Sequence, residues 1–135
     1  MSLQYMLDTN VLSSLMRNPH GAIAQRIEVV GESSICCSIV VASEMRYGAA
    51  KKGSEKLSLH VDAVLSALPV LPLNQSADAI YATVRNELTK AGTPIGPNDL
   101  FIAAHALVED LTLITANVGE FLRVPGLRVE DWERP

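Results

Sequence analysis

Five polar side chains lie either directly after short apolar segments of this sequence or in the first turns of helical patterns. Asp8 follows the segment QYML, Glu44 lies in SIVVASEMRYGA, and Asp99 lies in IGPNDLFIAAHA. Asn117 and Glu120 follow LTLIT, within LITANVGEF. In an open parallel sheet, functional groups gather beyond the carboxyl ends of the strands. We therefore expect these five groups, distant in sequence, to share one edge of a sheet.

Each of these residues also has an ordinary structural explanation. An aspartate near a helix start, such as Asp8 or Asp99, commonly caps the helix or interacts favourably with its dipole. Glu120 is as readily explained as an exposed loop carboxylate. Glu44 is harder to explain because its neighbours are largely apolar, and an ionised carboxylate in such surroundings needs a partner. The joint pattern, more than any single member, indicates a site.

Three or four carboxylates in one pocket repel one another, and burying them together forces protonation unless cations neutralise them. Hard divalent cations with oxygen ligands, Mg²⁺ or Mn²⁺, suit such a site, whereas no Cys or His spacing indicates zinc. Such ions activate water and stabilise leaving oxygens in phosphoryl chemistry. The pattern therefore predicts a magnesium or manganese site that acts on a phosphate ester.

The composition predicts one compact domain over residues 1–135. The chain has 135 residues, of which 48% are hydrophobic, enough for a single core. Its net charge of −4 repels a polyanion, so nucleic-acid binding would depend on local basic groups or bound cations. The basic candidates for RNA phosphate contacts are Arg17, Arg46, Lys51 and Lys52, and solvated surface is the alternative explanation for each.

The cysteines and the N-terminus predict a soluble cytoplasmic protein. Cys36 and Cys37 are adjacent in an apolar stretch, where strand neighbours point to opposite faces, so buried free thiols are expected rather than a disulfide. No signal-peptide pattern and no apolar run of about 20 residues is present, so no membrane contact is expected.

Apolar periodicity predicts an α/β fold in which short strands alternate with helices. Such an alternation requires crossover connections and so a mostly parallel sheet covered on both faces. Asn98 is predicted to cap the last long helix. Strands are expected at residues 4–7, 35–39, 68–73, 111–115 and 127–132, and helices at 11–17, 22–30, 40–50, 55–68, 76–90 and 99–109.

Four motifs occur in one order over almost the whole chain: MLDTNVL, Glu44 within SIVVASEMRYGA, TPIGPNDLFIAAHAL and LITANVGEFLRVPGLRVEDW. Together they resemble the PIN-domain ribonuclease toxins of bacterial toxin–antitoxin pairs, the VapC group. The resemblance implies a three-layer α/β/α sandwich and an Mg²⁺- or Mn²⁺-dependent endoribonuclease. It also implies a VapB-type antitoxin whose C-terminal segment enters the active site and whose N-terminal part binds operator DNA. A homodimer is expected as well.

The resemblance implies roles for individual residues. Asp8, Glu44 and Asp99 match the three core acids, which would hold the metal and position the attacking water. Asn10 matches the small polar residue of the DTN motif and is expected to orient Asp8 or the water ligands. Thr115 is expected to bond a site water or the scissile phosphate, although a strand-end hydroxyl that satisfies backbone groups is the alternative.

The fourth acidic position departs from the family pattern. Many PIN domains place an aspartate after the threonine of the last motif, where this chain has Asn117. An amide can coordinate through its carbonyl but brings no charge, so a second metal would be held less strongly. Glu120, three residues later, is expected to compensate. Whether one metal or two bind stays open.

Several functions remain open at this point. The leading prediction is an endoribonuclease that cuts initiator tRNA in the anticodon stem-loop, since resembling members with a DTN start and a PGLRVEDW-like end do so. The sarcin–ricin loop of rRNA, or an mRNA, is the alternative substrate. A haloacid-dehalogenase-like phosphatase would need a second acid where this chain has Asn10. A non-catalytic partner of a DNA-binding protein would share the antitoxin contact without the chemistry.

Overall fold

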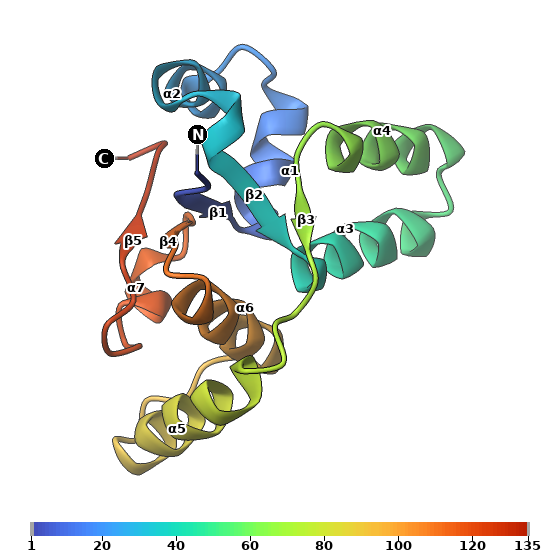
Figure 1. The fold of residues 1–135 in the computed structure, drawn as a ribbon. Helices are drawn as coiled ribbons and strands as arrows, with labels where there is room; N and C mark the ends of the chain where they lie inside the picture. The colour runs from blue at the N-terminus through green and yellow to red at the C-terminus, as the bar shows by residue number, and fades with distance from the viewer. Residues whose placement is uncertain (1, 135) are drawn as a thin grey trace.

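The computed structural model describes residues 2–134, which form a parallel sheet with helices between its strands (Figure 1). The strands are β1 (Tyr5–Leu7), β2 (Ile35–Ser38), β3 (Val70–Leu71), β4 (Thr112–Ile114) and β5 (Val129–Glu130). The helices are α1 (Thr9–Arg17), α2 (Ala22–Val30), α3 (Ile39–Lys52), α4 (Glu55–Ser66), α5 (Ala77–Lys90), α6 (Pro97–Val108) and α7 (Val118–Phe121). A short 3₁₀ turn, η1 (Glu32–Ser34), leads into β2.

The strand order β3-β2-β1-β4-β5 determines where a site can form. All strand pairs among the described residues are parallel, with Met6 of β1 opposite both Cys36 of β2 and Leu113 of β4. The chain moves outward in one direction from β1 to β3 and then crosses back to β4. Because crossover connections are right-handed, this reversal puts α5 and α6 on the opposite face from the earlier helices. The expected α/β sandwich is confirmed, and its topological switch point lies between β1 and β4.

The predicted helices all form; α2 has its predicted bounds, and the others are shifted by one or a few residues at one or both ends. Helix α6 begins at Pro97 with Gly96 in the capping position, so the expectation that Asn98 caps this helix is wrong. Proline is favoured at the first helical position because its missing N–H would have no helical partner there. The four-residue helix α7 was not predicted, because a single turn leaves no measurable periodicity.

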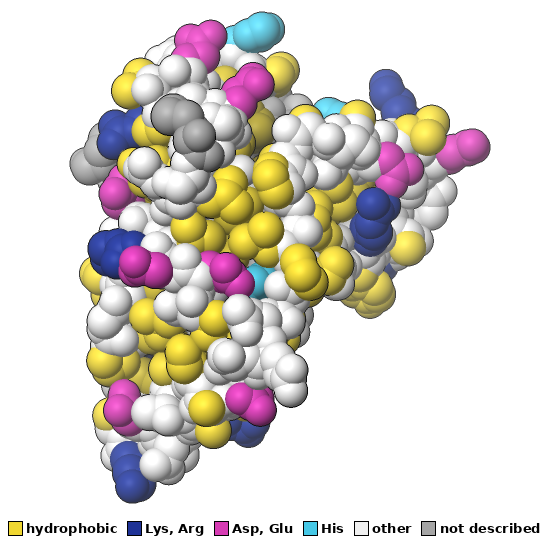
Figure 2. All heavy atoms as spheres, in the orientation of Figure 1, with side chains coloured by type: hydrophobic (Ala, Val, Ile, Leu, Met, Phe, Trp, Pro, Cys, Tyr) yellow, Lys and Arg dark blue, Asp and Glu magenta, His cyan; other side chains and the backbone are white. Residues whose placement is uncertain are grey.

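The core lies on both sides of the central strands. Met6, Leu7, Cys36, Cys37 and Leu113 are fully buried, and both cysteines are free thiols as expected. Residues 2–134 contain no helix long and apolar enough to cross a membrane. Figure 2 shows hydrophobic side chains gathered across the middle of one face, between α2 and α4. A hollow of about 340 Å³ lies between α1, α2 and α4, with an apolar lining that includes Leu12, Ile27 and Leu68.

Candidate active site

Asp8 occupies the turn between β1 and α1, at the switch point of the sheet. Its backbone N–H donates to the Ile114 carbonyl of β4 at 2.9 Å, which continues the β1–β4 pairing to the site itself. Its carboxylate caps α1 by accepting the Thr9 N–H at 2.8 Å. The Asp8 side chain is only 4% exposed, so burial strongly limits the water that can solvate its charge. The MLDTNVL motif therefore places one buried carboxylate, that of Asp8, at the edge of the sheet.

Thr115, directly after β4, and Asn10, in the first turn of α1, both contact this carboxylate. The buried Thr115 hydroxyl donates to Oδ2 of Asp8 at 2.8 Å, and the Asn10 amide lies 3.4 Å from the same oxygen. Oδ1 of Asn10 in turn accepts the backbone N–H of Ala116 at 3.1 Å. Asn10 therefore joins the turn after β1 to the turn after β4. The explanation that the Thr115 hydroxyl only satisfies backbone groups is incomplete, because this hydroxyl donates its proton to Asp8.

Glu44 comes from the second turn of α3 and is tied to the other two segments. Its Oε1 accepts the Thr9 hydroxyl at 2.6 Å, and its Oε2 lies 3.4 Å from the side-chain amide of Asn98 in α6. Neither Thr9 nor Asn98 was predicted from the sequence to be a site residue. Thr9 lies inside the DTN motif, next to Asp8, so its position in the sequence could have indicated a role at the site. The contact of Asn98 depends instead on how α3 and α6 pack against each other.

Asp99 and Glu120 form the opposite side of the cluster. Asp99 lies in the first turn of α6, and Glu120 lies in α7. One Glu120 oxygen accepts the backbone N–H of Gly96 at 3.3 Å, and the other contacts the side-chain amide of Asn117. The alternative that Glu120 is a free loop carboxylate is therefore wrong. Asn117 itself is exposed and contacts the cluster through Glu120.

The acidic groups perturb one another. Burial raises the pKa of Asp8, hydrogen bonds from Thr115 and Thr9 oppose the rise, and the charges of Glu44 and Glu120 add to it. Burial also raises the pKa of Asp99 to about 7, with further contributions from a hydrogen bond and charge repulsion with Glu120 and from the charges of Asp8 and Glu44. Four carboxylates from four separate segments are thus close enough to couple electrostatically.

The donor set fits a hard divalent cation by its chemistry. All groups that face the cluster carry oxygen ligands of the kind that Mg²⁺ and Mn²⁺ take, and like-charge repulsion would fall if a cation bound. In the conformation of residues 2–134, no three Asp, Glu, His or Cys side chains already surround one point as a metal site requires. Glu44 and Glu120 are held by other partners, so binding would require one of them to exchange a hydrogen bond.

A buried polar bridge links the two helices that carry Glu44 and Asp99. The Ser38 hydroxyl caps α3 by accepting the Val40 N–H at 3.1 Å and lies 2.7 Å from Nδ1 of His105 in α6. His105 is fully buried, and burial lowers its pKa. The ring tautomer determines whether Nδ1 accepts the Ser38 proton or donates its own. Sequence patterns gave no signal for this bridge, because Ser38 and His105 lie 67 positions apart.

Comparison with known proteins identifies the family. The family model described as the PIN domain matches residues 5–127. The tRNA(fMet)-specific endonuclease VapC of Salmonella typhimurium is 37% identical over 131 residues, which cover 96% of this chain and 98% of the relative. Ribonuclease VapC2 of Rickettsia felis is 35% identical over 132 residues, with the same coverage. The chain belongs to the VapC group of the PIN-domain family.

Solved VapC structures share the whole architecture. The chain aligns with DNA-bound VapBC from Salmonella typhimurium at a TM-score of 0.90 and 37% identity, covering 96% of this chain and 98% of that one. It aligns with VapBC2 from Rickettsia felis, bound to a promoter DNA fragment, at a TM-score of 0.87 and 35% identity over 98% and 99% of the two chains. PIN-domain nucleases generally use divalent metal ions, in agreement with the oxygen-donor cluster. Because the chain belongs to the PIN-domain family, the alternative of a haloacid-dehalogenase-like phosphatase is excluded.

The four basic residues predicted to contact RNA fall into two groups. Arg46 pairs with Asp62 of α4 on the surface, so its charge is largely compensated within the chain. Lys51 and Lys52 end α3, and Arg17 ends α1; all three are exposed. Arg17 and Lys52 line a pocket beside Glu44, whereas Lys51 does not. Contact of these groups with RNA stays a prediction.

Proposed function

We propose that this PIN-domain protein is a metal-dependent endoribonuclease and the toxin of a toxin–antitoxin pair, with residues 1–135 acting as one domain. The observation that carries the proposal is the cluster of Asp8, Glu44, Asp99 and Glu120 at the switch point of the sheet, with pKa values of both aspartates raised. Such a cluster has little use in a binding module, because mutual repulsion destabilises it. It becomes favourable when a cation that takes part in the chemistry is bound.

Asp8, Asp99 and Glu44 are the residues that would hold Mg²⁺ or Mn²⁺. The bound ion would supply charge neutralisation at the phosphate and water activation at neutral pH. Thr115 donates to Asp8 and so opposes the rise of its pKa, and Thr9 orients Glu44 by donating to it. Asn10 joins the two turns that border the site. Asn117 holds Glu120 beside Asp99. Glu120 thereby supplies the negative charge that the Asn117 amide lacks at the fourth position of the cluster.

The substrate we propose is structured RNA, with initiator tRNA ranked first. Relatives at 36% and 37% identity are named tRNA(fMet)-specific endonucleases, and their similarity covers 96% of this chain. An rRNA sarcin–ricin loop or an mRNA is the second-ranked substrate. Attack by water at phosphorus would leave 5′-phosphate and 3′-hydroxyl ends, which distinguish this chemistry from a reaction through the ribose hydroxyl.

We further propose a VapB-type antitoxin as the physiological partner, with operator DNA contacted only through it. Three solved relatives at 35% to 37% identity are VapBC structures, and two of them are bound to DNA. The apolar hollow between α1, α2 and α4 gives an amphipathic antitoxin segment a surface to cover. A homodimer is the assembly state that we expect, which light scattering on the antitoxin-free protein tests.

Cleavage mapping tests the nuclease proposal. The antitoxin-free protein is incubated with total tRNA and total rRNA in Mg²⁺ or Mn²⁺, and the cut sites and end groups are mapped. Asp8→Asn keeps the shape and the helix cap but removes the charge, so cleavage should fall by at least ~100-fold, as for loss of a group that acts in the transition state. Glu87→Gln, which removes an exposed charge of α5, is the control and should cleave normally.

Two outcomes would reject the proposal. If chelation with EDTA leaves cleavage unchanged, or if Asp8→Asn cleaves as fast as wild type, the acidic cluster is not a metal-dependent nuclease site. If neither protein cleaves any RNA while the wild type still binds an antitoxin, the non-catalytic binding function replaces the enzyme.

A further inference from the structure

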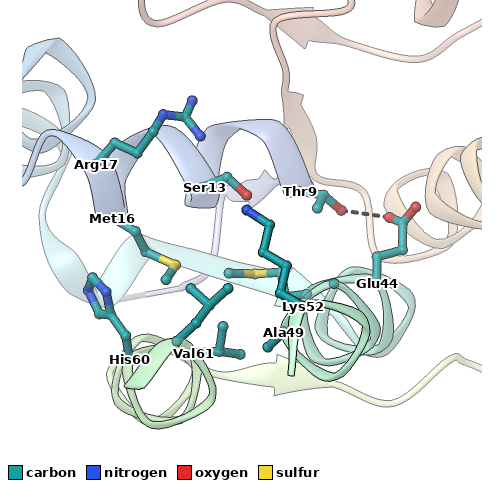
Figure 3. Close-up of a pocket in the computed structure, with 12 residues that line it drawn as sticks. Thr9, Ser13, Met16, Arg17, Glu44, Ala49, Lys52, His60 and Val61 are labelled. Carbon is teal, nitrogen blue, oxygen red and sulfur yellow. Dashed lines mark hydrogen bonds between the residues drawn. The ribbon is translucent and has the colours of Figure 1, made fainter. Parts of the chain in front are cut away.

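A pocket of about 380 Å³ opens beside the acidic cluster, between α1, α3 and α4 (Figure 3). Thr9 and Glu44 form the end that belongs to the active site, where the Thr9 hydroxyl donates to Glu44. Away from that end the lining becomes apolar, with Met16, Met45 and Val61. The pocket therefore runs directly from a candidate catalytic carboxylate over an apolar floor.

One face of α3 creates this space. Glu44, Gly48 and Lys52 are spaced by four residues, so they follow one another along the same side of the helix. A Cβ atom at Gly48 would meet no atom within 4 Å, and its φ is not in the left-handed region. Glycine in the middle of a helix destabilises it relative to alanine. Neither backbone conformation nor close packing requires the glycine, and its effect is to leave the pocket open.

The pocket is bordered by positive groups. Lys52 extends from α3 across the pocket toward Ser13 of α1, Arg17 follows Ser13 one turn later, and His60 of α4 stands at the far side (Figure 3). Among residues 2–134, neither Lys52 nor Arg17 takes part in an ion pair with an acid. In a chain of net charge −4, two unpaired cations beside an acidic site are suited to an anion.

We propose that this pocket binds one nucleotide of the RNA, the one adjacent to the scissile phosphate. The inference rests on the proposed nuclease function. The base lies over Gly48 against the thioethers of Met16 and Met45, and the flanking phosphate meets Lys52 and Arg17. An apolar floor next to cations suits an unpaired nucleotide, because apolar contact tolerates any base while charge positions the backbone.

The size and the charge both favour a nucleotide over a protein segment. A volume near 380 Å³ lies in the range of small-molecule sites. An apolar protein side chain would need no cations at the border, and an acidic one would be repelled by Glu44 at the inner end. A nucleotide instead uses the apolar floor and the cations together, with Glu44 left to the reacting phosphate.

A filling substitution tests the pocket without changing any charge. Gly48→Leu places a side chain between Glu44 and Lys52. Ala50→Leu adds bulk to the same helix at an exposed position outside the pocket and is the matched control. Gly48→Leu should unfold at a temperature equal to or above that of wild type, because leucine favours helix over glycine, and Ala50→Leu should unfold close to wild type. With bulk tRNA in Mg²⁺, we expect Gly48→Leu to raise KM by ~10-fold and Ala50→Leu by less than twofold.

A charge substitution tests the border separately. Lys52→Ala should raise KM ~5- to 10-fold and reduce the salt dependence of binding, since a phosphate contact is lost. Lys56→Ala removes the same charge from the same α3–α4 hairpin, outside the pocket, and should have less than a twofold effect. A fall in kcat with unchanged KM for either pocket variant would contradict the binding role.

A binding measurement separates failure of this inference from failure of the nuclease proposal, because it needs no cleavage. Nucleoside 5′-monophosphates added to labelled protein should shift the Gly48 amide and the Met16 and Met45 methyl resonances, whereas inorganic phosphate should leave the methyl resonances in place. Equal shifts with phosphate alone would reject the base site. If Gly48→Leu cleaves tRNA with unchanged KM but escapes inhibition by the antitoxin, the pocket serves the protein partner and the inference is wrong.

Discussion

Asp99→Asn should make the metal-free protein more stable at neutral pH. In the folded chain the pKa of Asp99 is raised from 3.8 to about 7, first by burial and then by Glu120, Asp8 and Glu44. The folded state therefore holds this proton more tightly than the unfolded state does. The penalty for ionising Asp99 is absent below about pH 4, grows as the pH rises toward 7, and is constant above it.

The structure sets the size of the effect. The interval from 3.8 to about 7 corresponds to at most about 4 kcal/mol, at 1.36 kcal/mol per pH unit. The Asp99 side chain is only half-buried, so water screens part of this interaction. We expect Asp99→Asn to raise the free energy of unfolding by about 1–2 kcal/mol at pH 8 and by nothing measurable at pH 4.

Urea denaturation in EDTA, repeated at intervals between pH 4 and 8, measures this difference. Glu87→Gln, with one exposed carboxylate of α5 removed, is the control and should run parallel to wild type at every pH. Saturating Mg²⁺ or Mn²⁺ should reverse the order at pH 8, because a ligand at 100 times its dissociation constant stabilises by about 2.7 kcal/mol and the variant binds it weakly. Parallel curves for Asp99→Asn and wild type would refute the account of the cluster.

Substitutions at three further positions test the residues that hold the acidic groups in place. Thr115→Val should slow single-turnover RNA cleavage by ~10-fold, because Asp8 loses a buried hydrogen bond, and Thr115→Ser should restore most of it; equal rates for both variants would contradict this. Ser38→Ala should cost about 1–3 kcal/mol in urea denaturation, because it removes a helix cap and the partner of His105. Glu120→Gln should bring the carboxyl titration of Asp99, followed by ¹³C NMR in metal-free protein, to a midpoint below about 7.

Sequence periodicity was sufficient to predict every strand and every long helix. The strand segments combine short length with apolar content, and the helices between them are long enough to show their own period. Helix ends and very short elements were less predictable, as the start of α6 at Pro97 and the four-residue α7 show. The ends of helices and the presence of single-turn helices depend on which backbone groups have a hydrogen-bond partner, and that partner is often remote in sequence.

The sequence alone determined the identity of the acidic groups and their place after strands or at helix starts, because chain polarity and the parallel alternation put these ends on one edge of the sheet. It also showed that Asn117 stands where an acid was expected. Only the tertiary structure decided how the groups are coupled. Glu120 joins the cluster through Gly96 and Asn117, and Thr9 holds Glu44. The physical reason is that electrostatic coupling and hydrogen bonding depend on distances of a few ångströms between segments, which sequence spacing does not contain.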